Sequence, residues 1–205
     1  SISIYKKDKK YFAPCHVSEL KKILKKNSNS KLLSGGTDLS LVVTKDRKDI
    51  ESIVYMNSIK ELNYIKNNNK YIEVGATTSL SNFETYIKKY YPDFNKILKR
   101  YGSIQIRNVA TIAGNIATAS PIGDNLPLLL ALDSQIVLQD IKKSKILPIN
   151  DFFISYRKTK LKKGEFIYSI RIPLYKNNIF KAYKISKRFD DDISSLCASF
   201  NLEIN

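Results

Sequence analysis

The sequence predicts an α+β fold with two lobes, a small parallel βαβ lobe followed by a larger lobe whose sheet is mainly antiparallel. Hydrophobic residues make up 43% of the 205-residue chain, which is enough to form a sizeable core. Near the N-terminus, segments typical of a strand, a helix and a strand follow one another, and this order predicts parallel pairing. Strands dominate the C-terminal third, which favours antiparallel pairing there.

The first lobe is assigned to residues 1–58. Residues 1–10 are polar and are expected to form a loose lead-in. A helix is expected at 18–26, because its apolar residues share one face and Ser18 can cap its start. The remaining elements expected in this lobe are a strand at 31–34, a helix at 37–44 and a strand at 53–56.

The second lobe is assigned to residues 59–190. The elements expected in and after it are a strand at 71–74, helices at 80–89, 94–101 and 127–132, and strands at 135–138, 165–172, 180–185 and 196–204. The strand at 165–172 alternates well, so one of its faces is expected to carry Phe166, Tyr168, Ile170 and Ile172.

Composition disfavours several classes of protein. The net charge is +16, but 29 of the 35 basic residues are lysine and they are spread along the chain, whereas proteins that read nucleic acid concentrate arginine. The two cysteines have no near neighbour, which excludes a zinc ribbon or iron–sulfur cluster supplied by this chain alone and favours two reduced, buried thiols. No apolar run approaches the ~20 residues of a membrane span. We therefore expect a cytoplasmic protein with no membrane or nucleic-acid partner.

The first candidate site is the segment 31–39, where an expected strand runs into Gly35 and Gly36 and a helix is expected to start at Thr37. Successive amides at such a helix start point outward and can bind phosphate oxygens. The segment is not a P-loop, because no Lys-Ser/Thr pair follows at the required spacing. An ordinary strand-to-helix turn is the alternative interpretation.

The second candidate site is the segment 108–123, which carries no charged side chain and is rich in alanine and glycine. Asn108, Thr111 and Asn115 supply amides and a hydroxyl among these small residues. Such a tract lets a flat ligand lie close to the main chain, and Asp124 at its end could accept hydrogen bonds from that ligand. The alternative is a packing surface between the two lobes.

The third segment, 183–192, places basic residues before three consecutive aspartates. Adjacent carboxylates point in different directions, so a solvated turn is favoured over a metal site. Lys184, Lys187 and Arg188 could instead balance the charge of a phosphate or of a reduced, anionic ring.

Together these segments resemble a known family. Residues 101–124 resemble the signature of the FAD-binding domain of the xanthine dehydrogenase family of molybdenum hydroxylases. Residues 34–39, 155–159 and 183–194 resemble other blocks of that domain and occur in the same order. The resemblance covers residues 12–205 and is greatest to the small, FAD-carrying subunit of bacterial enzymes. It differs at Ala113, where the family often has glycine.

The resemblance implies a two-lobed FAD domain that holds FAD extended between its lobes. Residues 32–39 would surround the pyrophosphate, 111–115 would line the diphosphate and ribityl region, and the loop 187–192 would lie beside the flavin and influence access of NAD or oxygen. The cofactor-binding residues implied are Leu32, Leu33, Ser34, Gly35, Gly36, Thr37, Asp38, Leu39, Tyr101, Thr111, Ile112, Ala113, Gly114, Asn115, Asp124, Ile167 and Lys184. Tyr101 would be an aromatic contact, Asp124 would bind a polar group of the nucleotide, Ile167 would be an apolar flavin contact and Lys184 a basic one.

The function implied is electron relay in purine metabolism or a related hydroxylation. Electrons from a molybdenum centre would pass through iron–sulfur clusters, both held by partner subunits or domains, to this FAD and then to NAD. No catalytic side chain and no metal ligand are assigned to this chain, because the cofactor carries the chemistry. Residues 191–205 would begin a truncated C-terminal domain.

Two alternatives remain open at the level of the sequence. One is another FAD enzyme of the same broad fold, such as a carbon monoxide dehydrogenase medium subunit or a wall-precursor reductase, although the block 188–192 argues against both. The other is a basic, non-enzymatic RNA-binding module, which the net charge of +16 keeps in view.

Overall fold

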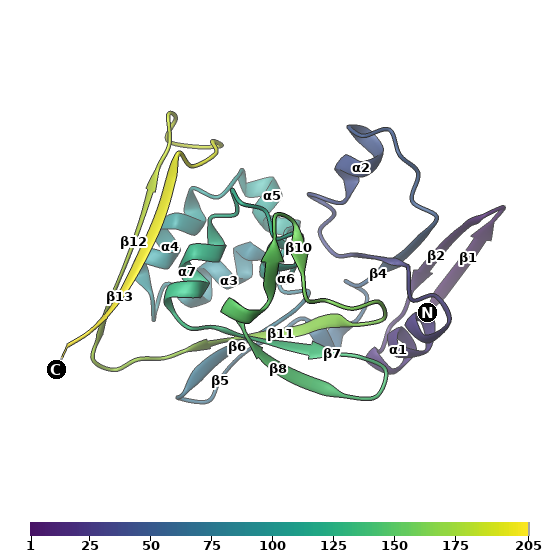
Figure 1. The fold of residues 1–205 in the computed structure, drawn as a ribbon, viewed down its shortest axis with the longest axis horizontal. Helices are drawn as coiled ribbons and strands as arrows, with labels where there is room; N and C mark the ends of the chain where they lie inside the picture. The colour runs from purple at the N-terminus through teal and green to yellow at the C-terminus, as the bar shows by residue number, and fades with distance from the viewer. Residues whose placement is uncertain (205) are drawn as a thin grey trace.

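A computed structural model describes residues 1–204 and shows two lobes side by side, with the chain termini at opposite ends (Figure 1). The elements of the smaller lobe are β1 (Ile2–Lys6), β2 (Lys9–Ala13), α1 (Val17–Lys26), β3 (Lys31–Leu33), α2 (Ser40–Thr44), β4 (Ser52–Tyr55) and the short 3-10 helix η1 (Lys60–Leu62). Its four strands form one sheet in the order β1-β2-β4-β3. Strand β4 runs parallel to both β2 and β3, so the predicted parallel layer is confirmed.

The expectation of a loose lead-in at residues 1–10 was wrong. Strands β1 and β2 pair antiparallel along their full length around a turn at Lys7, whose φ is +54°. β1 is exposed throughout, although it carries Ile2, Ile4 and Tyr5, and the charged residues 6–10 that follow these hide this short alternation in the sequence. Its pairing depends on β2, which turns Phe12 into the core of the smaller lobe.

Helix α1 begins at Val17, so Ser18 lies inside the helix and does not cap it. Glutamate carboxylates accept hydrogen bonds from two amides at the start of the helix. The Val17 N–H donates to Glu61 at 2.8 Å, and the Cys15 N–H donates to Glu19 at 2.8 Å. Helix α2 begins at Ser40 rather than Thr37, and the residues before it form an open turn. This turn carries the first candidate site.

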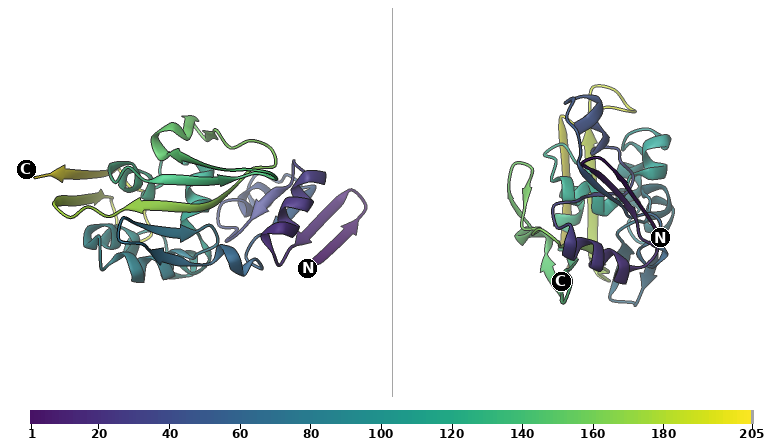
Figure 2. Two further views of the ribbon diagram at one scale, coloured as in Figure 1. Left: turned by 90° about the horizontal axis from the view of Figure 1, so that it is seen from below. Right: turned by 90° about the vertical axis from the view of Figure 1, so that its right-hand side faces the viewer.

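The larger lobe contains a five-stranded, wholly antiparallel sheet in the order β5-β6-β11-β7-β8, with its helices packed against one side (Figure 2). The strands are β5 (Ile65–Asn67), β6 (Tyr71–Gly75), β7 (Gln135–Gln139), β8 (Ser144–Pro148) and β11 (Phe166–Pro173). The helices are α3 (Leu80–Ile87), α4 (Pro92–Lys99), α5 (Ile104–Val109), α6 (Ile112–Thr118) and α7 (Asn125–Ala131). These elements confirm the α+β class.

Three short elements, η2 (Ile149–Asp151), β9 (Phe153–Ser155) and β10 (Lys158–Thr159), and two long strands, β12 (Asn178–Ile185) and β13 (Leu196–Glu203), complete the lobe. Strands β12 and β13 form a separate antiparallel pair that packs against α4 and α7. The Ser199 hydroxyl, on β13, donates to the Pro127 carbonyl of α7 at 2.6 Å. The division of the chain at residues 58/59 and 190/191 stays a prediction.

Strand β11 connects the two cores. A bulge between Ile167 and Ser169 interrupts its pairing with β7. Phe166 and Tyr168 therefore pack into the core of the smaller lobe, while Ile170 and Ile172 pack into the larger core. The expectation that all four residues share a face was wrong, because the bulge shifts the alternation by one position. Within residues 1–204, no helix is both long enough and apolar enough to cross a membrane.

Candidate cofactor site

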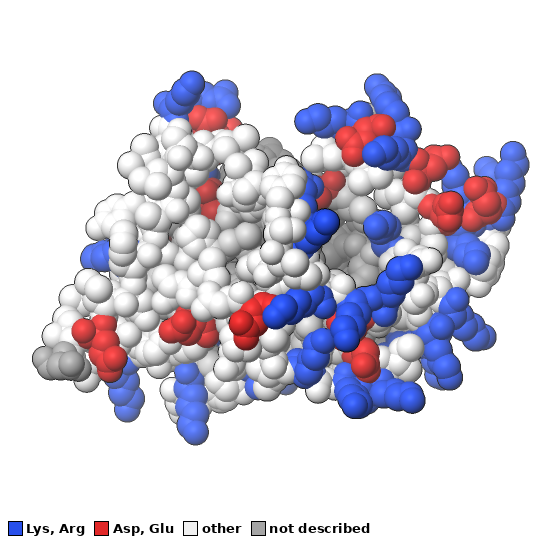
Figure 3. Space-filling view, in the orientation of Figure 1, with Lys and Arg blue, Asp and Glu red and all other residues white. Residues whose placement is uncertain are grey.

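A cleft of about 500 Å³ lies between the two lobes, and Figure 3 shows the hollow with basic side chains at its rim. One wall is the end of β3 with the turn 34–39 that follows it. The opposite wall is the start of α6, and β11 and the loop 161–165 complete the lining. The volume lies within the range of small-molecule and cofactor sites, roughly 300–1,000 Å³.

The turn after β3 offers backbone donors to this cleft. The amides of residues 35–39 donate to no acceptor among the described residues 1–204. Gly36 has φ +72°, a left-handed conformation that a side chain disfavours, and this turns the chain between β3 and α2. Residues 35–39 are partly exposed, so water can reach their amides, and a run of free amides beside a cleft can bind a ligand with several acceptor oxygens.

Gly35 brings the two walls into contact. A Cβ placed on Gly35 would lie 2.0 Å from the carbonyl oxygen of Val109, at the end of α5, and 2.8 Å from the Ala110 nitrogen. Only glycine permits this approach between the turn and the link from α5 to α6. The two segments singled out in the sequence, 31–39 and 108–123, therefore meet at one cleft.

The start of α6 is fixed by its own cap. The Thr111 hydroxyl accepts a hydrogen bond from the Gly114 amide at 3.0 Å, which is the usual N-cap arrangement. Ile112 is fully buried on the core side of the helix, so its side chain points away from the cleft. Gly114, Ala117 and Thr118 line the cleft, and their small side chains leave the helix surface accessible.

Thr77 lines the cleft and was not found from the sequence. It follows Gly75 at the end of β6, and 6% of its surface is exposed. Its hydroxyl has no hydrogen-bond partner among residues 1–204. The only local signal is its place just after a strand, which is too common to identify a site. An unpaired, buried hydroxyl in a cleft wall fits a site that binds a polar ligand.

Charged residues also line the cleft. Lys31, Lys162 and Lys163 belong to its lining, as do the acidic Asp38, in the turn, and Glu165. Asp38 forms an ion pair of 3.5 Å with Arg157, which lies between β9 and β10. The lining therefore has a net positive charge and favours an anionic ligand.

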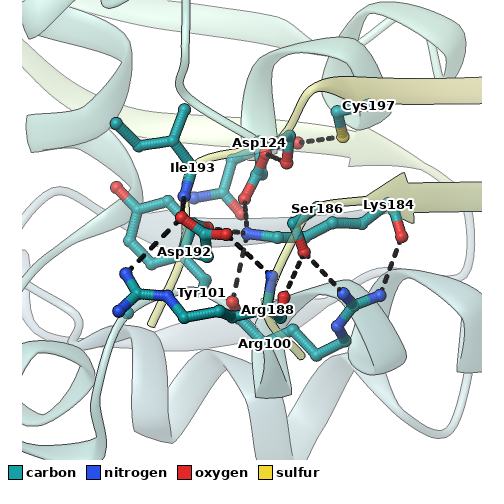
Figure 4. Close-up of polar contacts among 12 residues, drawn as sticks. Arg100, Tyr101, Asp124, Lys184, Ser186, Arg188, Asp192, Ile193 and Cys197 are labelled. Atoms are coloured by element: carbon teal, nitrogen blue, oxygen red, sulfur yellow. Dashed lines mark hydrogen bonds and ion pairs between the residues drawn. The ribbon is translucent and has the colours of Figure 1, made fainter. Parts of the chain in front are cut away.

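A second polar cluster lies outside the cleft lining, where β12 and β13 meet α7 (Figure 4). The Lys184 ammonium and the Asp124 carboxylate form an ion pair of 2.6 Å, with their side chains 2% and 5% exposed. Lys184 also donates to the carbonyl oxygens of Asp192 and Arg100, and the Ser194 hydroxyl donates to Asp124. The positive charge of Lys184, which was expected to face a ligand, is therefore balanced by the Asp124 carboxylate.

The loop 186–195 is ordered by hydrogen bonds around Arg100 (Figure 4). The Arg100 guanidinium donates to the Lys184 carbonyl at 2.8 Å and to the Ser186 hydroxyl at 2.9 Å, and it stacks on the Phe189 ring. Asp192 accepts from the Arg188 amide at 2.9 Å, and this bond lowers the pKa of the Asp192 carboxyl. Within residues 1–204, no group of His, Cys, Asp or Glu is arranged to hold a metal ion.

Tyr101 lies near this cluster. Burial first, and then the charges of Asp124 and Asp38, raise the pKa of the Tyr101 phenol to about 12. Its oxygen accepts a hydrogen bond from the Asn115 side chain at 3.0 Å. The phenol is therefore neutral at physiological pH.

The structure brings most of the residues implied by the resemblance to the cleft. Those in its lining are Leu32, Leu33, Ser34, Gly35, Gly36, Asp38, Leu39, Thr111, Ala113, Gly114 and Ile167. Those outside the lining are Thr37, in the same turn, the core residue Ile112, the hydrogen-bonded pair Tyr101 and Asn115, and the ion pair Asp124 and Lys184. The individual cofactor contacts of all these residues stay predictions.

The cleft fits an adenine dinucleotide in three respects. It has a run of free amides for phosphate oxygens, a thin helix surface opposite them, and an unpaired hydroxyl between the two.

Comparison with known proteins agrees with this geometry. The profile of the family described as the FAD binding domain in molybdopterin dehydrogenase matches residues 5–175. The chain is 33% identical to a xanthine dehydrogenase of Emericella nidulans over 97% of its own length and 16% of that protein. It is 30% identical to the nicotinate dehydrogenase FAD-subunit of Eubacterium barkeri over 72% of its own length and 51% of that protein.

Solved structures show the same fold. A chain of carbon monoxide dehydrogenase from Hydrogenophaga pseudoflava is similar with a TM-score of 0.89 and 24% identity, over 98% of this chain and 71% of that one. The MurB reductase of Thermus caldophilus is more distant, with a TM-score of 0.51 and 15% identity over 82% of this chain and 56% of that one. This chain spans about a sixth of the xanthine dehydrogenase, 16%, and about half of the nicotinate dehydrogenase subunit, 51%. With a family profile that extends over most of its length, the chain belongs to the family of FAD-binding domains of molybdopterin dehydrogenases.

Proposed function

We propose that this chain binds FAD in the cleft between its lobes and serves as the flavin component of a xanthine dehydrogenase-like molybdenum hydroxylase. In that role it receives electrons from iron–sulfur clusters and delivers them to NAD. The observation that carries the proposal is the run of free amides at residues 35–39, which faces the start of α6 across a cleft of about 500 Å³. A diphosphate supplies the acceptor oxygens that these amides lack.

The residues of the chain bind and orient, and FAD supplies the redox chemistry when it is bound. Gly35 sets the distance between the walls, because its backbone lies against Val109. Lysines in the cleft lining balance negative charge on the phosphates. The neutral phenol of Tyr101 provides an aromatic surface near the loop 186–195 without adding a charge.

Partner domains or subunits supply the iron–sulfur and molybdopterin centres in this proposal. The sequence similarity to a protein described as an FAD-subunit, and to a small part of much longer xanthine dehydrogenases, supports such an arrangement. The substrate of the complex is a purine or another heterocycle, since xanthine and nicotinate enzymes both appear among the relatives. A cytoplasmic location, inferred from the sequence, belongs to the same proposal.

Absorption spectroscopy tests the first half of the proposal. The purified chain is unfolded, freed of any bound flavin, refolded with FAD, FMN or riboflavin, and passed over a desalting column. We expect retained flavin absorption near 450 nm with FAD and far less with riboflavin, because the amides bind the diphosphate. Equal retention of all three flavins, or retention of none, contradicts the proposal.

Anaerobic titration with NADH tests the second half. If NAD is the acceptor, NADH reduces the FAD-loaded chain in the reverse direction, and the absorption near 450 nm is lost. An FAD-loaded chain that NADH leaves oxidised, while dithionite reduces it, would overturn NAD as the acceptor and leave FAD binding intact.

A further inference from the structure

Three side chains form a line of hydrogen bonds from α7 to Tyr101. Asn125, the first residue of α7, is fully buried, and its amide nitrogen donates to the Asn115 amide oxygen at 3.2 Å. The Asn115 amide nitrogen in turn donates to the Tyr101 phenol oxygen at 3.0 Å. Asn125 belongs to none of the sequence motifs described above, and neither the cleft lining nor the ion pair of Lys184 includes it.

Packing holds the Asn115 amide in place but does not decide which end of it faces Tyr101. A Cβ placed on Gly123 would lie 3.0 Å from its nitrogen and 3.4 Å from its oxygen, so the amide packs directly against the main chain of Gly123. The hydrogen bond from Asn125 requires the Asn115 oxygen on that side. Asn115 therefore presents its nitrogen, a donor, to Tyr101.

The hydrogen bond that Tyr101 accepts from Asn115 restricts where the Tyr101 hydroxyl can donate its own proton. Because Tyr101 already accepts from Asn115, its hydroxyl proton must point elsewhere. Among residues 1–204 that proton has no acceptor. The raised pKa of Tyr101, about 12, keeps the proton in place at neutral pH. The phenol is thus a neutral hydrogen-bond donor that has no acceptor among residues 1–204. It lies outside the cleft lining but close to it, because the charge of Asp38, which lines the cleft, contributes to its raised pKa.

From this geometry we propose that Asn125 is a positioning residue, which fixes the Asn115 amide so that the Tyr101 hydroxyl donates a hydrogen bond to bound FAD. The inference rests on the proposed FAD function and adds a residue and a direction to it. The acceptor is an oxygen or nitrogen of the flavin ring or an oxygen of the ribityl chain. Without Asn125, the Asn115 amide can turn over and present its oxygen, and the phenol proton then bonds to Asn115 instead of FAD.

Two variants test the line of hydrogen bonds. Tyr101→Phe removes the hydroxyl and keeps the ring, while Asn125→Leu removes the donor and keeps the branched shape of the side chain. We expect each to weaken FAD binding by roughly fivefold to tenfold, the effect of one lost hydrogen bond. We expect each also to shift the long-wavelength flavin absorption band in the same direction if the acceptor is on the ring. FAD affinity is measured by quenching of flavin fluorescence in the complete chain.

Asn95→Leu is the matched control. Asn95 is also buried, at 5% exposed, and its amide nitrogen donates to the Glu84 carbonyl at 2.9 Å, within the helical layer and outside the cleft lining. Its replacement should lower the melting temperature as Asn125→Leu does, because each removes a hydrogen bond made by a buried amide. It should leave FAD affinity and the flavin spectrum unchanged, since Asn95 shares no hydrogen bond with Tyr101, Asn115 or Asn125.

The double variant Asn125→Leu/Tyr101→Phe separates positioning from general loosening of the fold. If Asn125 acts through the phenol, the double variant binds FAD no more weakly than Tyr101→Phe alone. Additive losses overturn the inference, as does wild-type affinity in Tyr101→Phe or an equal loss in Asn95→Leu. If Asn125→Leu does not fold, Tyr101→Phe still decides whether the hydroxyl contacts FAD. Failure of the wild-type chain to bind FAD would instead overturn the proposed function.

Discussion

Two adjacent glycines in the turn after β3 are required for different reasons. Gly35 is required because any side chain would overlap the Val109 carbonyl, at 2.0 Å from a Cβ. Gly36 is required because its φ of +72° is a conformation that side chains disfavour. The first glycine therefore controls the contact between lobes, and the second controls the direction of the free amides.

Replacement of Gly36 by valine should disrupt cofactor binding. A β-branched residue at φ +72° is strained, and its Cβ would lie 3.2 Å from the Leu33 side chain, so the turn must rearrange and its amides diverge. We expect a loss of FAD affinity of at least tenfold, measured by fluorescence quenching. Asn69→Val is the control, since Asn69 has φ +68° between β5 and β6 and is absent from the cleft lining. Equal FAD affinity in Gly36→Val and wild type contradicts the assignment of this turn.

At the scale of single residues, the sequence predicted which glycines and small residues belong to the site, but not the polar residues Thr77 and Asn125. A pair of glycines after a strand has a local signature, because it needs only the backbone of its own segment. Thr77 and Asn125 have no such signature, since their roles depend on groups brought close by the fold. Lys184 shows the opposite error. Its charge was visible in the sequence, but the buried ion pair that it forms with Asp124, 60 residues away, was not.

At the scale of elements, the sequence predicted the longer strands and helices and missed several short ones. β1 was missed because a run of charged residues follows its Ile2, Ile4 and Tyr5. α6 was missed because its small, uncharged residues show no helical face, and α5 because it has only six residues and buries none of them, although Ser103 and Thr111 cap the two helices. The bulge in β11 was invisible, since both strand faces meet an apolar core, one in each lobe.

The segment 156–165, after β9, spans the cleft from one lobe to the other. Arg157 pairs with Asp38 of the glycine turn at 3.5 Å, and an added Cβ on Gly164 would lie 3.9 Å from Ser28 after α1. Both contacts join the larger lobe to the smaller one over the cleft lining. We therefore expect this segment to slow the departure of a bound ligand.

Arg157→Gln tests that expectation. The pair is about half exposed, at 47% and 44% of the side-chain surface, so it contributes little to stability, ~0.2–1 kcal/mol. We expect an unchanged melting temperature without FAD and an FAD dissociation rate about twofold to fivefold higher, measured by the recovery of free-FAD fluorescence after a large dilution. Lys158→Gln is the control, because it removes a charge from the neighbouring β10 and Lys158 has no acidic partner among residues 1–204. Identical dissociation rates in Arg157→Gln and wild type exclude the effect.

At the scale of the whole molecule, the larger core and the residues packed against it hold several weak acids in their neutral form. Desolvation raises the pKa of the Tyr91 and Tyr101 phenols to about 12, and it raises the pKa of the Cys197 thiol to about 12 as well. In the unfolded chain these groups release their protons at roughly pH 8.5–10. Between those values the unfolded state binds fewer protons than the folded state, so stability falls as pH rises.

Thermal unfolding at a series of pH values checks this consequence. We expect the melting temperature to fall steadily from about pH 9 to about pH 12, most steeply above pH 10. Loss of net positive charge acts in the opposite direction up to the isoelectric point near 9.7. Tyr91→Phe should reduce the slope, since it removes one such phenol, which donates to the Pro173 carbonyl at 2.6 Å. A melting temperature that stays constant from pH 10 to pH 12 rules out this account.

The contact at Gly35 has a consequence for how this protein tolerates change. The gap between the lobes is defined by main-chain atoms on both sides, the Gly35 backbone and the Val109–Ala110 peptide. Peptide geometry is the same whatever side chains surround it. Neighbouring positions can therefore vary in sequence while the spacing of the two walls persists, provided that this single position keeps a hydrogen atom in place of a side chain.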